Sequence, residues 1–235
     1  MTKGLKITLL VLVVLLLDQG LKIWVKTNMG YGEEIMLIGD WARLHFTENP
    51  GMAFGLELPE PFGKLILSLF RIVAVGGLIY YLRLLQKEGA SLGLLASFAL
   101  ILAGAIGNIL DSAFYGLIFS ASGYHHTGLA TMFPEAGGYA GFLYGKVVDM
   151  LYFPMFRGHF PDWFPFWSGQ PYLFFRPVFN IADVAITTGV ISIIVFHRSF
   201  FTAEEENTTT DATTTGNIVD EILNEDENIS TEKKE

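Results

Sequence analysis

"SLGLLASFALILAGAIGNILDSAFYGLIF", residues 91–119, contains a single charged residue, Asp111. About 20 apolar residues suffice to cross the hydrocarbon core of a bilayer. This stretch therefore predicts a transmembrane helix, long enough to tilt or to project beyond the membrane. Four small or polar residues recur at spacings of three and four and so share one helix face: Gly104, Gly107, Asn108 and Asp111. The glycines permit close helix contact, whereas Asn108 and Asp111 need partners inside a helix bundle.

Three further segments are long and apolar enough to cross a membrane: residues 7–25, 65–85 and 175–196. The whole chain is 51% hydrophobic and 17% charged, where a soluble domain has about 25% charged residues. Lys3 and Lys6 make the first segment resemble a signal peptide, but no small-residue cleavage site follows it, so we expect an uncleaved anchor. The sequence thus predicts an all-α integral membrane protein with four transmembrane helices.

The loops of such a bundle alternate between the two sides of the membrane, and four spans put both termini on the same side. Basic residues that would flank the spans on that side are Lys3, Lys6, Arg83, Lys87 and Arg198. The positive-inside rule makes this side cytoplasmic. Residues 27–64 and 120–174 are then expected to lie outside.

Both outer loops have a recognisable character. Residues 42–46 alternate in polarity and are followed by Asn-Pro-Gly, which predicts a small β-structured unit. The second loop contains "YFPMFRGHFPDWFPFWSGQPYLFF", whose aromatic residues are typical of a membrane interface and whose prolines prevent a long helix. At about fifty residues it is longer than a compact connection needs, so we expect it to cover something.

The formal charge of −9 resides entirely in the C-terminal tail, residues 203–235, where 11 acidic residues outnumber two lysines. This tail is predicted to be disordered and cytoplasmic. The chain has no cysteine, which excludes disulfides, thiolate metal sites and a cysteine nucleophile. No phosphate-binding glycine loop, basic patch or metal-ligand spacing is evident, so we expect no cofactor, metal or nucleic-acid partner.

Two carboxylates stand out as candidates for chemistry. Asp149 ends the apolar run of "GKVVDMLYF", and Asp183 shares a helix face with Asn180 and Thr187 in the last apolar segment. Two carboxylates brought together share one proton, because like charges a few ångströms apart cannot both ionise. The ionised one can activate water while the protonated one polarises a peptide carbonyl. A proton or ion relay would use the same chemistry.

Asp18 and Lys22, four residues apart, form an acid–base pair on one helical face. This pair either anchors the helix end at the interface or orients a nearby site. A transporter or proton-coupled channel would spread its acids across the bilayer, whereas Asp111, Asp149 and Asp183 are predicted to gather toward one side. A scaffold protein would not need polar Asn/Asp pairs on three apolar segments. A surface-facing catalytic site is therefore favoured over the transporter alternative.

Taken in order, five motifs resemble the bacterial lipoprotein signal peptidase family, signal peptidase II: "LDQGLK", "FTENPGMAFG", "GAIGNILDS", "GKVVDMLYF" and "FRPVFNIADVAI". The resemblance covers residues from about 5 to 198. It implies an intramembrane aspartic endopeptidase of the bacterial inner membrane. Such an enzyme removes the signal peptide of a prolipoprotein before the diacylglyceryl-modified cysteine, at a site toward the outer leaflet, and inhibition by globomycin-type peptides is expected.

The resemblance also implies roles for individual residues. It places the catalytic pair on Asp149 and Asp183 and an outer β-cradle at about residues 29–58. The residues that it places around the site are Asn49, Asn108, Asp111, Asn180, Asp18 and Lys22.

Three features depart from the family pattern. Ser112 stands where an arginine usually follows the aspartate of "GNILD", so another cation is expected to take its place, with Lys146 and Arg176 as candidates. Met52 replaces a common small residue. The stretches 113–144 and 151–174 are longer than the family core requires, and they could form an enlarged outer lid or a surface for substrate chaperones.

Overall fold

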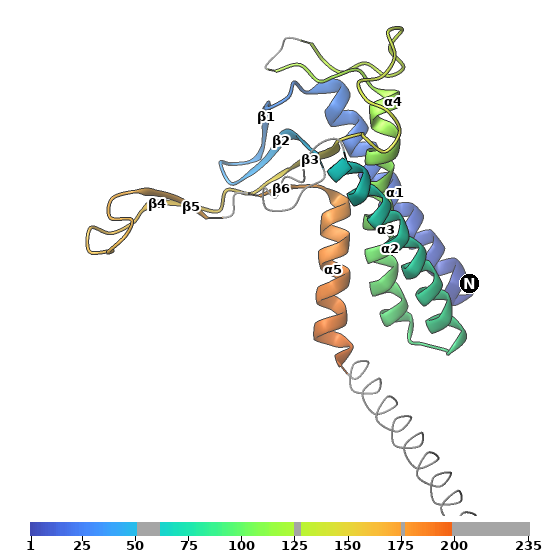
Figure 1. Ribbon diagram of the computed structural model, residues 1–235. Coiled ribbons are helices and arrows are strands. Elements are labelled where there is room, and N and C mark those ends of the chain that lie inside the picture. The colour runs from blue at the N-terminus through green and yellow to red at the C-terminus, as the bar shows by residue number, and fades with distance from the viewer. Residues whose placement is uncertain (51–61, 125–127, 175–176, 199–235) are drawn as a thin grey trace, which may run out of the picture. The chain divides into compact units, whose positions relative to one another are not determined.

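The computed structural model of the chain describes residues 1–50, 62–124, 128–174 and 177–198 (Figure 1). The chain divides into two compact units, Met1–Val190 and Ile191–Glu235, and of the second only residues 191–198 are described. Met52, Arg176 and the predicted disordered tail 203–235 lie outside the described residues.

Three helices in the described part of the chain are long and apolar enough to cross a membrane. They are α1 (Lys3–Asn28), α2 (Phe62–Lys87) and the continuous stretch Leu92–Ile118, which comprises α3 (Leu92–Leu110), the π-helix η1 (Asp111–Tyr115) and α4 (Gly116–Ile118). Thr2 and Ser91 cap α1 and α3 by accepting hydrogen bonds from backbone N–H groups three residues on. Large apolar side chains such as Leu16, Phe70 and Val73 are more than two-thirds exposed, as lipid-facing residues are in an isolated chain.

Of the fourth predicted span, residues 175–196, the structure describes residues 177–196, and these are helical from Ile181, where α5 (Ile181–Phe196) begins. Val178 and Phe179 instead form strand β6 (Val178–Phe179). Pro177 lacks an N–H group and disfavours helix in the residue before it, so the helix starts after it. With 16 residues, α5 is shorter than the other three apolar helices.

A four-stranded antiparallel sheet, in the order β1-β2-β3-β6, lies beside the ends of α1 and α4 and the start of α5 (Figure 1). Its other strands are β1 (Glu34–Ile38), β2 (Ala42–Asn49) and β3 (Val147–Tyr152). The β-unit predicted at about 29–58 is therefore present in β1 and β2, although residues 51–58 are not described. The sheet is larger than predicted, because β3 joins it from the second loop and β6 joins it from the start of the predicted fourth span. The all-α description must be amended accordingly.

The two faces of β2 and β3 have different surroundings, because successive side chains of a strand point to opposite faces. One face packs on the ends of the helices in a cluster of buried residues: Val25, Met29, Leu44, Phe46, Tyr115, Phe119, Val148 and Met150. Asp149 lies between Val148 and Met150 and so belongs to the other face. The sheet therefore presents Asp149 away from this core.

The glycines of α3 allow close packing, as their spacing predicted. A Cβ added to Gly104 would lie 2.2 Å from the carbonyl oxygen of Ala182, and one added to Gly107 would lie 2.7 Å from the carboxylate of Asp18. Any larger residue at these two positions would push the start of α5 and the middle of α1 away from α3. These glycines thus bring three helices together where the polar residues lie.

Candidate active site

Asp149 and Asp183 are linked through one residue, Asn180. Asp149 is buried on β3, and Asp183 lies in the first turn of α5. The Nδ2 of Asn180 donates to Oδ1 of Asp149 at 2.6 Å, and the Oδ1 of Asn180 accepts from the backbone N–H of Asp183 at 2.9 Å. The N–H of Asn180 in turn donates to Oδ2 of Asp183 at 3.2 Å. This reciprocal pattern is a capping box, so the turn that begins α5 also fixes Asp183.

Two other predicted asparagines contact the same carboxylates. Asn108 of α3 donates from Nδ2 to Oδ1 of Asp183 at 2.9 Å and accepts at Oδ1 from Nδ2 of Asn180 at 3.2 Å. Asn49, at the end of β2, donates to Oδ2 of Asp149 over a longer 3.4 Å. The structure thus brings together five of the predicted site residues, which come from β2, α3, β3 and the start of α5.

Lys22, fully buried on α1, holds the remaining predicted residues. Its Nζ lies 2.9 Å from Oδ2 of Asp18, 2.8 Å from Oδ2 of Asp111 and 2.9 Å from Oδ1 of Asn108. A buried ammonium between two buried carboxylates is compensated on both sides, whereas removing it would leave two uncompensated charges. The Asp18–Lys22 pair therefore contacts the site, which favours orientation over simple anchoring of the helix end.

Asp18 and Asp111 each hold the backbone of a residue that precedes a candidate catalytic aspartate. Oδ1 of Asp18 accepts from the N–H of Ala182 at 2.8 Å, and Oδ2 of Asp111 accepts from the N–H of Val148 at 3.2 Å. Lys22 joins the two carboxylates, so one cation on α1 ties the start of α5 to β3. The positions of the two candidate carboxylates are set by this frame as well as by their own contacts.

Burial, followed by the nearby charge of Asp183, raises the pKa of Asp149 to about 7, against the lowering effect of the hydrogen bond from Asn180. Asp149 thus tends to keep its proton near neutral pH. Asp183 accepts two N–H groups at a helix N-terminus, where the aligned peptide dipoles favour negative charge. The two carboxylates thus have different surroundings, since Asp149 is buried on a strand and Asp183 lies at a helix N-terminus.

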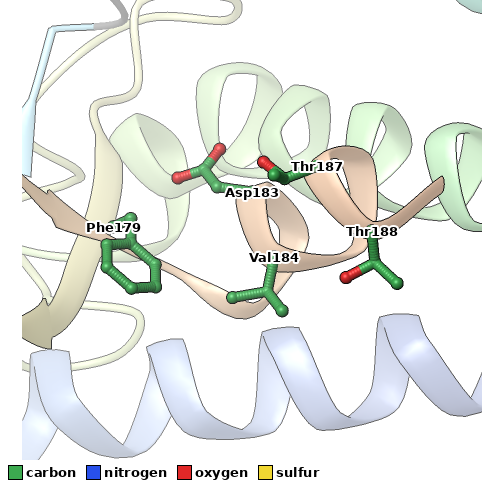
Figure 2. Close-up of a pocket in the computed structure, with 5 residues that line it drawn as sticks. All are labelled: Phe179, Asp183, Val184, Thr187 and Thr188. Atoms are coloured by element: carbon green, nitrogen blue, oxygen red, sulfur yellow. The ribbon is translucent and has the colours of Figure 1, made fainter. Parts of the chain in front are cut away.

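A pocket of about 390 Å³ opens beside Asp183 (Figure 2). Its lining comes from β6 and the first two turns of α5: Phe179, Asp183, Val184, Thr187 and Thr188. Thr187 shares the pocket with Asp183, as the spacing of four predicted. The pocket therefore offers an apolar surface with a carboxylate at its edge, which suits an apolar chain with a reactive polar group.

Comparison with known proteins identifies the family to which this arrangement belongs. A sequence profile described as signal peptidase (SPase) II matches residues 10–200. The lipoprotein signal peptidase of Porphyromonas gingivalis is 50% identical over 194 residues, which cover 82% of this chain and 83% of the relative. That of Amoebophilus asiaticus is 41% identical over 191 residues, covering 80% of this chain and 75% of the relative. The chain belongs to the signal peptidase II family.

Two solved structures of a bacterial membrane enzyme share the fold. One, determined at 2.3 Å resolution, has a TM-score of 0.52 and 22% identity, covering 81% of this chain and 85% of that one. The other, determined at 1.9 Å, has a TM-score of 0.51 and 24% identity, covering 81% and 90%. At these identities the likeness establishes the fold alone. The transporter alternative finds no support in any of these comparisons.

The structure describes one of the two cations predicted to replace the family arginine, Lys146, because Arg176 lies outside the described residues. Ser112 is buried, and its hydroxyl donates to the carbonyl of Asn108 at 3.1 Å. The Nζ of Lys146 lies 3.3 Å from Oε2 of Glu48, on the core side of the sheet. Lys146 immediately precedes β3, which begins at Val147. Arg71 of α2 is a further basic residue near the candidate site, where it interacts electrostatically with Asp183, Asp111 and Asp149, in decreasing order.

Sequence reasoning missed Arg71, Gln19 and Lys26. Arg71 interrupts an apolar segment, and a charge at membrane depth is by itself a signal of function. Gln19 stands next to Asp18, and its Nε2 donates to Oδ1 of Asp111 at 2.8 Å. Lys26 follows Lys22 by four residues, so helical spacing could have placed it on the same face of α1.

Proposed function

We propose that this chain is a membrane-embedded aspartic endopeptidase that removes signal peptides from prolipoproteins, cutting before a diacylglyceryl-modified cysteine. Membership in the signal peptidase II family supports a protease of lipoprotein processing in a membrane. The observation that carries the catalytic type is the pair Asp149 and Asp183, bridged by Asn180 at the edge of a pocket. Family membership alone does not identify the catalytic residues. The geometry of Asp149 and Asp183 supports their assignment as the catalytic pair.

The proposed chemistry divides the labour between the two carboxylates. Ionised Asp183 takes a proton from a water molecule, whose oxygen forms a bond to the scissile carbonyl carbon. Protonated Asp149 gives its proton to the carbonyl oxygen as negative charge develops there. The tetrahedral intermediate then collapses, the C–N bond breaks, and Asp183 returns its proton to the leaving amine of the cysteine. Both carboxylates recover their starting states once Asp149 takes back the proton of the carbonyl oxygen.

Supporting roles follow from the contacts. Asn108, Asn180 and Asn49 donate to the two carboxylates and hold their orientations. Asp18 and Asp111 accept from the backbone N–H groups of the residues that precede Asp183 and Asp149 in the sequence. Lys22 forms ion pairs with both Asp18 and Asp111. We propose that the pocket beside Asp183 receives the apolar part of the substrate next to the scissile bond. The reaction as proposed uses only groups of this chain and water.

We further propose that α5 completes a four-helix membrane domain, residues 1–202, with both termini in the cytoplasm and the sheet at the outer surface. The positive-inside distribution of the predicted loops supports this orientation. The three long apolar helices and the first turns of α5 each have one end beside the sheet, as spans with their outer ends together would (Figure 1). The lipid chains of the substrate would then stay in the outer leaflet while its peptide bond reaches Asp149 and Asp183.

The decisive experiment incubates the purified full chain with a prolipoprotein peptide whose cysteine carries diacylglyceryl, and with the same peptide unmodified. Mass spectrometry should show a product beginning at the modified cysteine, with the unmodified peptide left intact. A globomycin-type cyclic peptide should block the cut. Absence of cleavage, or equal cleavage of both peptides, would contradict the proposal, and proton flux into liposomes without proteolysis would revive the transporter alternative.

A further inference from the structure

The second outer loop contains a separate two-stranded hairpin, β4 (Phe156–His159) and β5 (Pro171–Phe174). The two strands pair with each other and with no other strand in the described part of the chain. Figure 1 shows the hairpin reaching away from the sheet and from the helices. An isolated two-stranded hairpin is at best marginally stable in water. A further contact is therefore needed to hold it.

The tip of this hairpin, residues 160–170, is closed by its own backbone. The N–H of Phe160 donates to the carbonyl of Gln170 at 2.9 Å, and the N–H of Gly169 donates to the carbonyl of Phe160 at 3.0 Å. Ser168 donates from its hydroxyl to the carbonyl of Asp162 at 3.0 Å. The tip is thus a defined turn that presents its side chains in fixed directions.

Aromatic rings cover this turn. Phe164 stacks on Phe160 and on Trp167, with ring centroids 5.1 and 5.8 Å apart. Trp163 and Phe166 pack edge-on against this stack and remain 79% and 80% exposed. Soluble surfaces rarely expose an apolar cluster of this kind, which marks a contact with another phase or another protein.

The low charge of the tip and the aromatic surface at the hairpin base indicate what the hairpin contacts. The tip "FPDWFPFWSGQ" has one charged residue, Asp162, and no basic residue that would seek anionic groups. At the base of the hairpin, Phe153 contacts both the half-exposed Trp41 and Phe179, with centroid distances of 6.2 and 5.7 Å. Phe179 also lines the pocket beside Asp183. The aromatic surface thus continues from the hairpin base to the place where a lipidated substrate would enter.

We propose that the aromatic tip of the β4–β5 hairpin inserts into the interfacial layer of the outer leaflet. Tryptophan and phenylalanine rings gain there because they bury apolar area while the indole N–H keeps polar partners. The contact is hydrophobic, so it does not depend on lipid charge. It rests on the proposed placement of the sheet at the outer surface, but it requires no catalysis.

The absence of cysteine from the chain allows a clean test. Phe166→Cys, labelled with an environment-sensitive fluorophore in the full chain, is reconstituted into phosphatidylcholine vesicles. Glu135→Cys, an exposed position in the same loop outside the hairpin, is the matched control. The label at position 166 should emit at shorter wavelength and lose most of its intensity with brominated lipids, whereas the label at 135 should behave as in water. Water-like emission at both positions would overturn the proposal, even if the protein cleaves its substrate normally.

Two further arms identify the cause of insertion. Vesicles with phosphatidylglycerol should give the same result at position 166, and a signal that appears only with anionic lipid would contradict a hydrophobic contact. A label at Ser168→Cys should move from lipid to water when Trp163, Phe166 and Trp167 are replaced by serine. A label that stays in lipid would show that the aromatic side chains do not carry the contact. Because none of these readings uses substrate, failure of the hairpin proposal and failure of the proposed function are distinguishable.

Discussion

Glu48 and Asp149 are buried carboxylates on neighbouring paired strands, yet they face opposite sides of the sheet. Glu48 pairs in register with Val148 and points with it toward the helix ends, whereas Asp149 pairs with Thr47 and points away from them. Glu48 forms an ion pair with the buried Lys26, accepts from the hydroxyl of Ser122 at 2.8 Å and lies 3.3 Å from Nζ of Lys146. Asp149 accepts from the amides of Asn180 and Asn49.

One small sheet can therefore hold a structural carboxylate on one face and a candidate reactive carboxylate on the other. Burial opposes ionisation of Glu48, but the charge of Lys26 and its hydrogen bond outweigh burial and hold the pKa of Glu48 below its ordinary value. Burial and the charge of Asp183 instead raise the pKa of Asp149 to about 7. A neutral amide can orient a carboxyl group without forcing it to ionise, and a chemical step needs that freedom.

The largest expected effect contrasts Asp149→Asn with Glu48→Gln. Loss of a general acid or base lowers kcat by about 100- to 10,000-fold, so Asp149→Asn and Asp183→Asn should both nearly abolish cleavage while the protein stays folded. Glu48→Gln should lower the unfolding temperature, because Lys26 loses its counter-charge, and should leave kcat near the wild-type value. Cleavage rates and thermal unfolding in detergent measure both effects. A reversed pattern would mean that the two faces have been assigned to the wrong roles.

The two buried lysines of α1 sharpen the same contrast. Lys22→Met leaves Asp18 and Asp111 uncompensated, which costs about 3–5 kcal/mol of stability. It also frees the backbone that carries the catalytic pair, and a displacement of about 1 Å costs about 100-fold in rate. Lys26→Met should lose comparable stability without the loss of rate in the folded fraction. The cleavage rate divided by the folded fraction distinguishes the two variants. Equal values for Lys22→Met and Lys26→Met would contradict the positioning role of Lys22.

The two carboxylates should respond oppositely to pH. Folded Asp149 holds its proton up to about pH 7, whereas an unfolded aspartate loses it near 3.8, so rising pH between these values destabilises the folded state by up to roughly 4 kcal/mol. Glu48, with its lowered pKa, contributes stability above the ordinary glutamate pKa that is lost as pH falls. Unfolding curves from pH 4 to pH 8 should therefore lose their alkaline decline in Asp149→Asn. An unchanged decline would assign it to another group.

The smallest expected effect concerns Arg71. A positive charge near Asp149 favours its ionised form, so Arg71→Gln should let Asp149 keep its proton to higher pH. The alkaline limb of the pH–activity profile should move up by about one pH unit or less. Arg83→Gln, an exposed arginine on the same helix, is the control and should leave the profile in place. A loss of activity without a shift in the profile would indicate a packing role for Arg71.

Much of the site could be predicted because helical spacing converts sequence into geometry. The spacings that group Asn108 with Asp111 and Asn180 with Asp183 are local properties of the chain, and the glycine stripe on α3 follows from the same rule. Asn180, however, precedes the helix and caps it, because Pro177 and the pairing of Val178 with Tyr152 delay its start.

What could not be predicted depends on contacts between distant segments. The pairing of β3 with β2 places Asp149 on the face away from the core and Lys146 close to Glu48. No periodicity in residues 144–152 predicts this pairing. The ion pair of Lys26 with Glu48 joins α1 to β2, and the sequence gives no sign that these two segments are in contact. The sequence shows Arg71 as a charge in an apolar segment, but its electrostatic interaction with Asp183, Asp111 and Asp149 depends on the fold.

The most direct test follows the proton on Asp149 and the activity together. Infrared difference spectra across pH 5–9 can follow the protonated carboxyl band that disappears in Asp149→Asn, while kcat is measured on the same preparation with the diacylated peptide. If protonated Asp149 acts on the substrate, the band and the activity should decline together, near pH 7. Activity that persists unchanged after Asp149 has lost its proton would contradict the claim that the protonated carboxyl acts on the substrate.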